Sequence, residues 1–230
     1  MKQKIVATLV FLLAVNFSFA QKPYFTRGGD FIFSYGLVTD DAGQDVTSSL
    51  RFSCWYHFSE TMNIDFGKGA GMITGVGMEN VGIITKPKDD YTVKQRAYAL
   101  GVPLGLRFGD LENSNFIALG AEGELMLDYK EKVFNGNDKV RKHHEWLSNN
   151  TNLLNPSVFL KYQKKSLVIT AKYYLFDFLI PSNILTEEGS APIPASAIST
   201  SKMFYISIGY SNKGKSKGKK ISEPKKVNLT

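Results

Sequence analysis

The chain is poor in cysteine, in histidine and in long apolar segments. Cys54 is the one cysteine among 230 residues, so no intrachain disulfide can form and the fold must be stable without one. Cys54 alternates with apolar residues, a setting in which a small buried side chain is its usual role. We identify no partner base for it, which argues against a catalytic thiol.

Long apolar runs are missing after residue 20, which excludes a helical membrane protein. The first twenty residues are different. Lys2 and Lys4 form a charged start, IVATLVFLLAV follows, and Ser18-Phe19-Ala20 supplies small residues at its end. This pattern predicts a secretory signal peptide over residues 1–20. An N-terminal membrane anchor is the alternative, but about 11 apolar residues are too few to span a bilayer.

The body of the chain has almost no net charge. Of the formal net charge of +7, Lys2 and Lys4 supply two and residues 211–230 a net six, which leaves −1 for residues 21–210. A nucleic-acid partner is therefore not supported. The basic residues of the tail include Lys213, Lys215, Lys217, Lys219 and Lys220. Its Lys, Gly and Ser content predicts a disordered segment over 211–230.

Helical periodicity is also scarce, and strand-like alternation takes its place. We count eight candidate strands. They are Gly29–Val38, Thr47–Phe58, Gly69–Thr85, Val93–Phe108, Asn115–Glu131, Pro156–Gln163, Leu167–Phe178 and Lys202–Tyr210. The connections after the second, fourth and sixth strands are short, and the others are longer. In an up-and-down meander this puts all long loops at one end, as in outer-membrane barrels.

The stretch VTSSLRFSCWYHFSE, residues 46–60, raises the question of which face is inside. Strict alternation assigns Leu50, Phe52 and Phe58 to one face and Arg51, Trp55 and His57 to the other. On the other strands, the residues that alternate with the large apolar ones are rich in Gly, Ala and Ser. Small residues suit the crowded interior of an eight-stranded barrel, whereas lipid accepts large apolar side chains. The sequence therefore predicts an all-β, eight-stranded antiparallel up-and-down transmembrane β-barrel of the outer-membrane type over residues 21–210.

Two groups of side chains follow from this assignment. Charges of both signs in a narrow interior should pair into a polar network that plugs the lumen, and a gated ion path is the alternative. The expected lumen network comprises Arg51, His57, Arg107, Glu122, Glu124, Lys161 and Lys172. Aromatic residues near strand ends predict interfacial girdles. The expected girdle residues are Tyr56, Phe58 and Phe108 with Tyr210 at the short-turn end, and Tyr129 near the other end.

Chemistry beyond this network has weak support. Gly101 and Ala99 should lie near Glu122 and Glu124 in the hairpin, which leaves room for the carboxylates. Paired carboxylates can act as acid and base, but a plugged lumen offers no substrate cleft. KHHEW, residues 142–146, has histidines that point apart and no second ligand group with zinc spacing. We therefore predict no catalytic, cofactor or metal site, and interpret KHHEW as a segment whose Trp146 packs over the barrel mouth.

Several motifs together resemble the small outer-membrane β-barrel proteins of the Bacteroidetes. They are YHFSE, GMITGVGMENVGIIT, RAYALGVPLGLRFGD, NPSVFLKY and FYISIGY, and the resemblance covers about residues 21–210. It implies an outer-membrane barrel and no particular activity. Such barrels often end on an aromatic residue. Here a basic tail follows Tyr210, which departs from that pattern.

The function expected from the sequence is that of a non-enzymatic outer-membrane protein with a structural or partner-binding role and no cofactor. Its long loops should lie outside and both mature termini in the periplasm, where the tail could contact a partner or the cell wall. The alternatives are a narrow outer-membrane pore and a secreted lipocalin-like barrel that binds an apolar ligand. The lipocalin alternative requires the large apolar residues to point inward.

Overall fold

The computed structural model describes residues 22–88, 90–180 and 198–213. These residues form strands and their connections, and no helix in this part of the chain has the length and apolar character of a transmembrane span. The strands are β1 (Tyr24–Asp40), β2 (Asp45–Ser49), β3 (Arg51–Ser53), β4 (Phe58–Asp65), β5 (Ala70–Lys88), β6 (Tyr91–Asp110), β7 (Asn115–Asn135), β8 (Asp138–Trp146), β9 (Leu154–Lys164), β10 (Leu167–Tyr174) and β11 (Ile198–Lys213).

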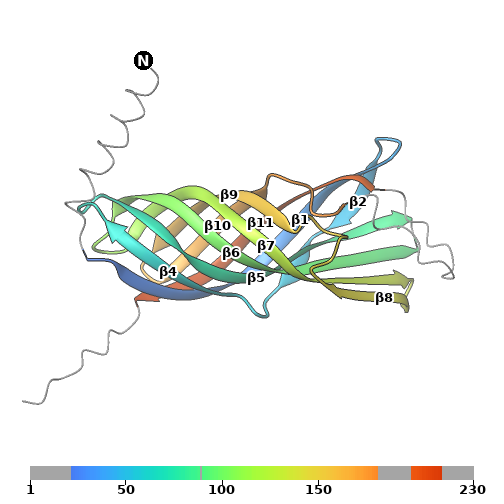
Figure 1. Cartoon of the computed structure of the whole chain (residues 1–230), viewed down its shortest axis with the longest axis horizontal. Helices are drawn as coiled ribbons and strands as arrows, with labels where there is room; N and C mark the ends of the chain where they lie inside the picture. The colour runs from blue at the N-terminus through green and yellow to red at the C-terminus, as the bar shows by residue number, and fades with distance from the viewer. Residues whose placement is uncertain (1–21, 89, 181–197, 214–230) are drawn as a thin grey trace, which may run out of the picture.

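All strands belong to one antiparallel sheet that closes on itself. β11 pairs with β1 along most of its length, from Thr26 opposite Lys213 to Val38 opposite Ser201. β2, β3 and β4 share one position in the wall, and β8 and β9 both pair with β7, so the ring has eight positions. The predicted all-β, eight-stranded antiparallel barrel is confirmed. Figure 1 shows the closed wall along its length.

Side chains alternate between the two faces as the strand period requires. On β6, Val102 and Leu104 point outward, with Leu104 60% exposed, whereas Ala97, Ala99 and Arg107 are buried inside. On this strand the outer face thus carries large apolar side chains and the inner face small or charged ones. This arrangement reverses that of a water-soluble barrel.

The two ends of the barrel differ, although the connections are not those predicted. Turns 66–69, 111–114 and 165–166 lie at one end, the short-turn end. At the other end the strands themselves continue beyond the predicted bounds. The segment between β7 and β9 contains β8, which was predicted as loop, and β1 joins β2 through four residues. β5 to β8 therefore project from this end as hairpins (Figure 1). We call this end the hairpin end.

The single second strand predicted over Thr47–Phe58 is wrong. The wall breaks between β3 and β4, where Tyr56 has a φ of 63° and the chain leaves the sheet. Trp55 lies within this break, where the alternation is interrupted, and it is 73% exposed instead of facing the interior. Val46 contacts the interior apolar cluster, although its alternation with Phe52 predicted an outward side chain.

The prediction that Tyr129 belongs to an outer girdle is also wrong, because β7 contains a bulge. Tyr98 of β6 lies opposite Asp128 and Ala99 lies opposite Met126, so Leu127 is an extra residue. An extra residue exchanges the inward and outward sets beyond it. Tyr129 therefore points inward, where it is 2% exposed and donates a hydrogen bond to Glu131.

The other predicted girdle residues are exposed but do not form one ring. Phe108 and Tyr210 lie near the short-turn end, since the ladder places Tyr210 opposite Leu167, the first residue of β10. Tyr56 instead contacts the ring of Tyr98 at 5.5 Å, toward the hairpin end. The reason is that the second wall position continues through β4 to Asp65, so Tyr56 and Phe58 do not end it.

β11 extends past the predicted boundary at residue 210. Lys213, assigned to the disordered tail, is its last residue and lies opposite Thr26. The predicted signal peptide and Lys215, Lys217, Lys219 and Lys220 lie outside the described residues.

Candidate functional site

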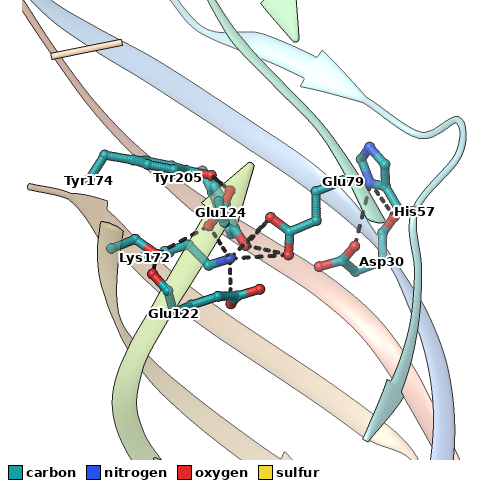
Figure 2. A network of polar contacts seen from close by, with 9 residues as sticks. Asp30, His57, Glu79, Glu122, Glu124, Lys172, Tyr174 and Tyr205 are labelled. Carbon is teal, nitrogen blue, oxygen red and sulfur yellow. Dashed lines mark hydrogen bonds and ion pairs between the residues drawn. The ribbon is translucent and has the colours of Figure 1, made fainter. Parts of the chain in front are cut away.

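The centre of the lumen is an ionic cluster around Lys172 of β10. Its Nζ lies 3.1 Å from Glu79 Oε2, 2.8 Å from Glu122 Oε2 and 2.9 Å from Glu124 Oε1. An ammonium has three N–H donors, so one lysine can serve three carboxylates. Figure 2 shows the three glutamates converging on this nitrogen from β5 and β7.

Hydroxyl groups complete the cluster. Tyr205 donates to Glu79 at 2.9 Å, and Tyr174 donates to Glu124 at 2.6 Å. Ser157 of β9 donates to the other oxygen of Glu124 at 3.1 Å. These donors come from β9, β10 and β11, so the cluster joins the strands on opposite sides of the barrel. Charge-assisted hydrogen bonds of this kind stabilise carboxylates that are removed from water.

Small residues on neighbouring strands provide the room for the carboxylates. The β6–β7 ladder places Gly101 opposite Glu124 and Pro103 opposite Glu122. A Cβ atom at Gly101 would lie 2.0 Å from Glu122 Oε1, which no side chain could occupy without moving that carboxylate. The placement of Gly101 beside both glutamates agrees with the hairpin register expected from the sequence.

A second polar group lies beside the cluster. His57 Nδ1 is 3.0 Å from the carbonyl oxygen of Asp30 and 3.4 Å from its carboxylate, and His57 Nε2 is 3.0 Å from Ser53 Oγ. The imidazole is 1% exposed. His57, in the break before β4, therefore links β1 to the end of β3, and Figure 2 shows it beside Asp30.

Arg107 is interior but separate from the glutamates. Its guanidinium binds Asp65 of β4, donates to the Tyr24 hydroxyl at 3.1 Å and lies 5.0 Å from the Phe116 ring centre. Arg107, Tyr24 and Phe116 line a vestibule of about 310 Å³ at the short-turn end. Asp65, the counter-ion of Arg107, was not expected in the lumen. Residues 59–68 were predicted as a turn, whereas β4 occupies most of this segment and ends at Asp65.

The remaining two predicted lumen residues lie apart from Lys172. Arg51 reaches across the break in the wall and donates to Asn80 Oδ1 at 2.6 Å. Lys161 lines a cavity of about 80 Å³ together with Glu122 and Lys172, and its Nζ lies 5.9 Å from the Phe159 ring centre. The predicted set thus divides into several groups, of which only Lys172, Glu122 and Glu124 are in direct contact.

An apolar layer fills the lumen toward the hairpin end. Phe178 and Leu179, from the segment after β10, are fully buried with Met203 and Ile83 in this layer. Their backbone is held inside, because the Phe178 and Leu179 N–H groups both donate to Ser201. From the hairpin end toward the short-turn end, the lumen thus holds this apolar layer, the ionic cluster around Lys172 and the ionic group around Arg107, and a second apolar cluster that includes Phe116 lies beside Arg107.

The KHHEW segment is part of β8 and does not pack over the mouth as predicted. Trp146 and Leu147 are exposed. His144 binds Asp128, and His143 Nε2 lies 3.5 Å from Glu145. Ser148 donates to Glu145 at 2.6 Å, which holds the pKa of that carboxyl below its ordinary value. Among the described residues, no three or more His, Cys, Asp or Glu side chains are placed so that they could hold a metal ion.

Sequence reasoning missed Glu79, Tyr174, Tyr205, Asp30 and Asp65. Glu79 lies directly opposite Ala99, so extending the hairpin register to the preceding strand would have found it. Tyr174 meets Glu124 and Tyr205 meets Glu79 across the lumen, and in both cases the strand of the tyrosine does not pair with the strand of the glutamate. No local signal in the sequence marks such contacts.

Comparisons with known proteins give only distant structural similarity. No protein-family profile matches the chain, and no curated protein matches its sequence. The attachment invasion locus protein Ail of Yersinia pestis, solved with the heparin analogue sucrose octasulfate, has 13% identity and a TM-score of 0.36, with 84% of this chain and 100% of that chain covered. Neisserial surface protein A has 11% identity and a TM-score of 0.33, with 85% and 99% covered.

Proposed function

We propose that this chain is an integral outer-membrane protein whose closed barrel is a non-enzymatic scaffold for partner contacts at its hairpin end. The observation that carries the proposal is the inverted barrel: large apolar side chains cover the outside, and the inside holds charges. Only a lipid surrounding makes this distribution favourable, because apolar surface in water costs free energy and closed barrels satisfy their backbone groups in lipid.

The height of the apolar surface fits a membrane. On β6, the outward side chains from Phe108 to Leu100 are apolar and exposed, and Tyr98 follows them. Ten residues separate Phe108 from Tyr98, which is about 34 Å along a strand and about 24 Å at a tilt of 45°. The apolar band of outer-membrane barrels is about 25 Å tall. On β1, β11 and β10, the aromatic residues Tyr35, Phe204 and Tyr173 lie opposite one another and form a similar aromatic row.

The layered lumen favours a scaffold over a pore. A permeating ion would have to cross the apolar layer of Phe178 and Leu179 and then separate Lys172 from its three carboxylates. A lipocalin-like function is disfavoured for a related reason. The interior that would receive an apolar ligand is already filled by the ionic groups around Lys172 and Arg107 and by the buried side chains of Phe178 and Leu179.

The projecting hairpins of β5 to β8 provide the surface for partners, since they extend past the apolar band. The Bacteroidetes resemblance and a periplasmic contact of the basic tail remain predictions. The extracellular placement of the hairpins is part of the present proposal.

Two measurements on the full chain test the proposal. The unboiled protein from isolated outer membranes should resist SDS and migrate differently from the boiled protein. In planar bilayers the refolded protein should show no stepwise conductance. Recovery as a soluble protein in the periplasm or medium would contradict the membrane location. Reproducible conductance steps from correctly folded protein would instead favour the narrow pore.

A further inference from the structure

The hairpin end carries an unusual arrangement of cations on β6, β7 and β8. Cross-strand pairing places positive side chains directly opposite one another in two adjacent rows on the outward face. The first row is Arg96, Lys130 and His144, and the second is Lys94, Lys132 and Lys142. We call these six residues the basic rows.

Folding alone does not favour the basic rows, because like charges directly opposite each other destabilise a strand pair. The inward face of the same strands is different: there Arg141 Nε lies 3.5 Å from Glu131, and Gln95 donates to Glu131 at 3.0 Å. On the outward face, no carboxylate within the described residues forms an ion pair with Lys94, Lys130, Lys132 or Lys142, and Asp128 binds His144. The six cations thus lie together on one face, and among the described residues only His144 has a carboxylate partner there.

The height of the basic rows above the apolar band indicates which negative groups could balance their charge. Arg96 and Lys94 continue the outward series of β6 immediately after Tyr98. Arg96 lies about 7 Å along the strand from Tyr98 and Lys94 about 14 Å, which corresponds to about 5 and 10 Å of height at a 45° tilt. The headgroup layer begins at that level, and lysine side chains can reach into it.

Neighbouring aromatic groups belong to the same level. Arg96 donates to the Tyr98 hydroxyl at 2.7 Å, and Trp146, opposite Asp128 on the outward face, is exposed. Tryptophan and tyrosine at this depth are typical of a membrane interface. A soluble anion would not require the cations to follow an apolar surface on the same face of the same strands.

We propose that the basic rows bind phosphate groups of lipids in the leaflet that surrounds the hairpin end. Lysine and arginine form charge-assisted hydrogen bonds with phosphate oxygens, and two parallel rows can hold more than one phosphate. Lipid phosphates would then supply the negative charge that the strands lack. This inference rests on the proposed membrane location of the barrel.

The test uses the full chain refolded in neutral detergent micelles and lipid A carrying two phosphates as the probe. The rise in unfolding temperature with probe concentration gives a half-saturating concentration. The triple variant K94Q/K132Q/K142Q removes one row, and K22Q/K68Q/K164Q removes three exposed lysines elsewhere. We expect the row variant to raise the half-saturating concentration at least tenfold and the control less than twofold. High salt should weaken binding to the wild type.

Three outcomes would overturn the inference. The row variant could bind as the wild type does, the dephosphorylated lipid could bind equally well, or inorganic pyrophosphate could displace the lipid at the same concentration, which would assign the rows to a soluble anion. SDS resistance of each unboiled variant shows that it is folded. A wild-type chain that stays soluble without detergent and lacks this resistance would refute the membrane location itself, which distinguishes the two failures.

Discussion

Glu124 of β7 and Lys172 of β10 lie 2.9 Å apart at the centre of the barrel, although 48 residues separate them along the chain. The pair joins two strands, β7 and β10, whose backbones do not pair with each other. Its contacts with Glu79 and Glu122 extend the connection to β5, so one ammonium links three strands across the lumen.

The first prediction concerns this ammonium. Lys172→Met should destabilise the folded barrel by about 3–5 kcal/mol, because it leaves three carboxylates in the lumen, two of them buried, without their cation. Urea unfolding in lipid vesicles, followed by the loss of the fast-migrating gel band, measures the change. Adding Glu79→Gln, Glu122→Gln and Glu124→Gln to Lys172→Met should recover most of the loss. Equal stability of Lys172→Met and the wild type would show that the cluster does not hold the walls together.

The second prediction concerns the space beside the glutamates. Gly101→Val should cost about 1–3 kcal/mol, because its side chain would displace the Glu122 carboxylate from Lys172. Gly123→Val is the matched control on the adjacent strand. A Cβ atom there meets nothing within 4 Å, so its effect should stay within about 0.5 kcal/mol. The same unfolding assay compares the two, and equal effects would contradict the assigned packing.

The third prediction concerns the outer face. Leu104→Lys places a charge in the middle of the apolar band and should destabilise the inserted barrel by about 2–4 kcal/mol. Val140→Lys replaces a similarly exposed residue on the projecting β8 and should change the stability by less than about 0.5 kcal/mol. In a water-soluble barrel both substitutions would be nearly neutral. Two neutral results in vesicles would therefore count against a lipid-facing surface at Leu104.

Much of the fold was predictable because strand alternation is a local signal. The outward series on β6 and the approach of Gly101 to Glu124 both follow from one hairpin register. The errors arose where the period is interrupted. The extra residue Leu127 turns Tyr129 inward, and the break around Tyr56 turns Trp55 outward. Neither irregularity has a proline or glycine that would have indicated it.

The candidate site was predictable only in part, for a different reason. Glu122, Glu124 and Lys172 could be assigned to the interior one strand at a time. Which charges meet depends on barrel closure and on the stagger between distant strands, and alternation does not determine these. Arg107 therefore pairs with Asp65 at the short-turn end instead of joining the glutamates.

The central claim is that the outer apolar surface contacts lipid, and the depth of a tryptophan at position 104 tests it most directly. In a chain with Trp55→Phe, Trp146→Phe and Leu104→Trp, refolded into vesicles, the emission should be quenched by lipids brominated near the middle of their acyl chains. Aqueous iodide should have little effect on it. Strong quenching by iodide with no effect of the brominated lipids would place this surface in water and contradict the account.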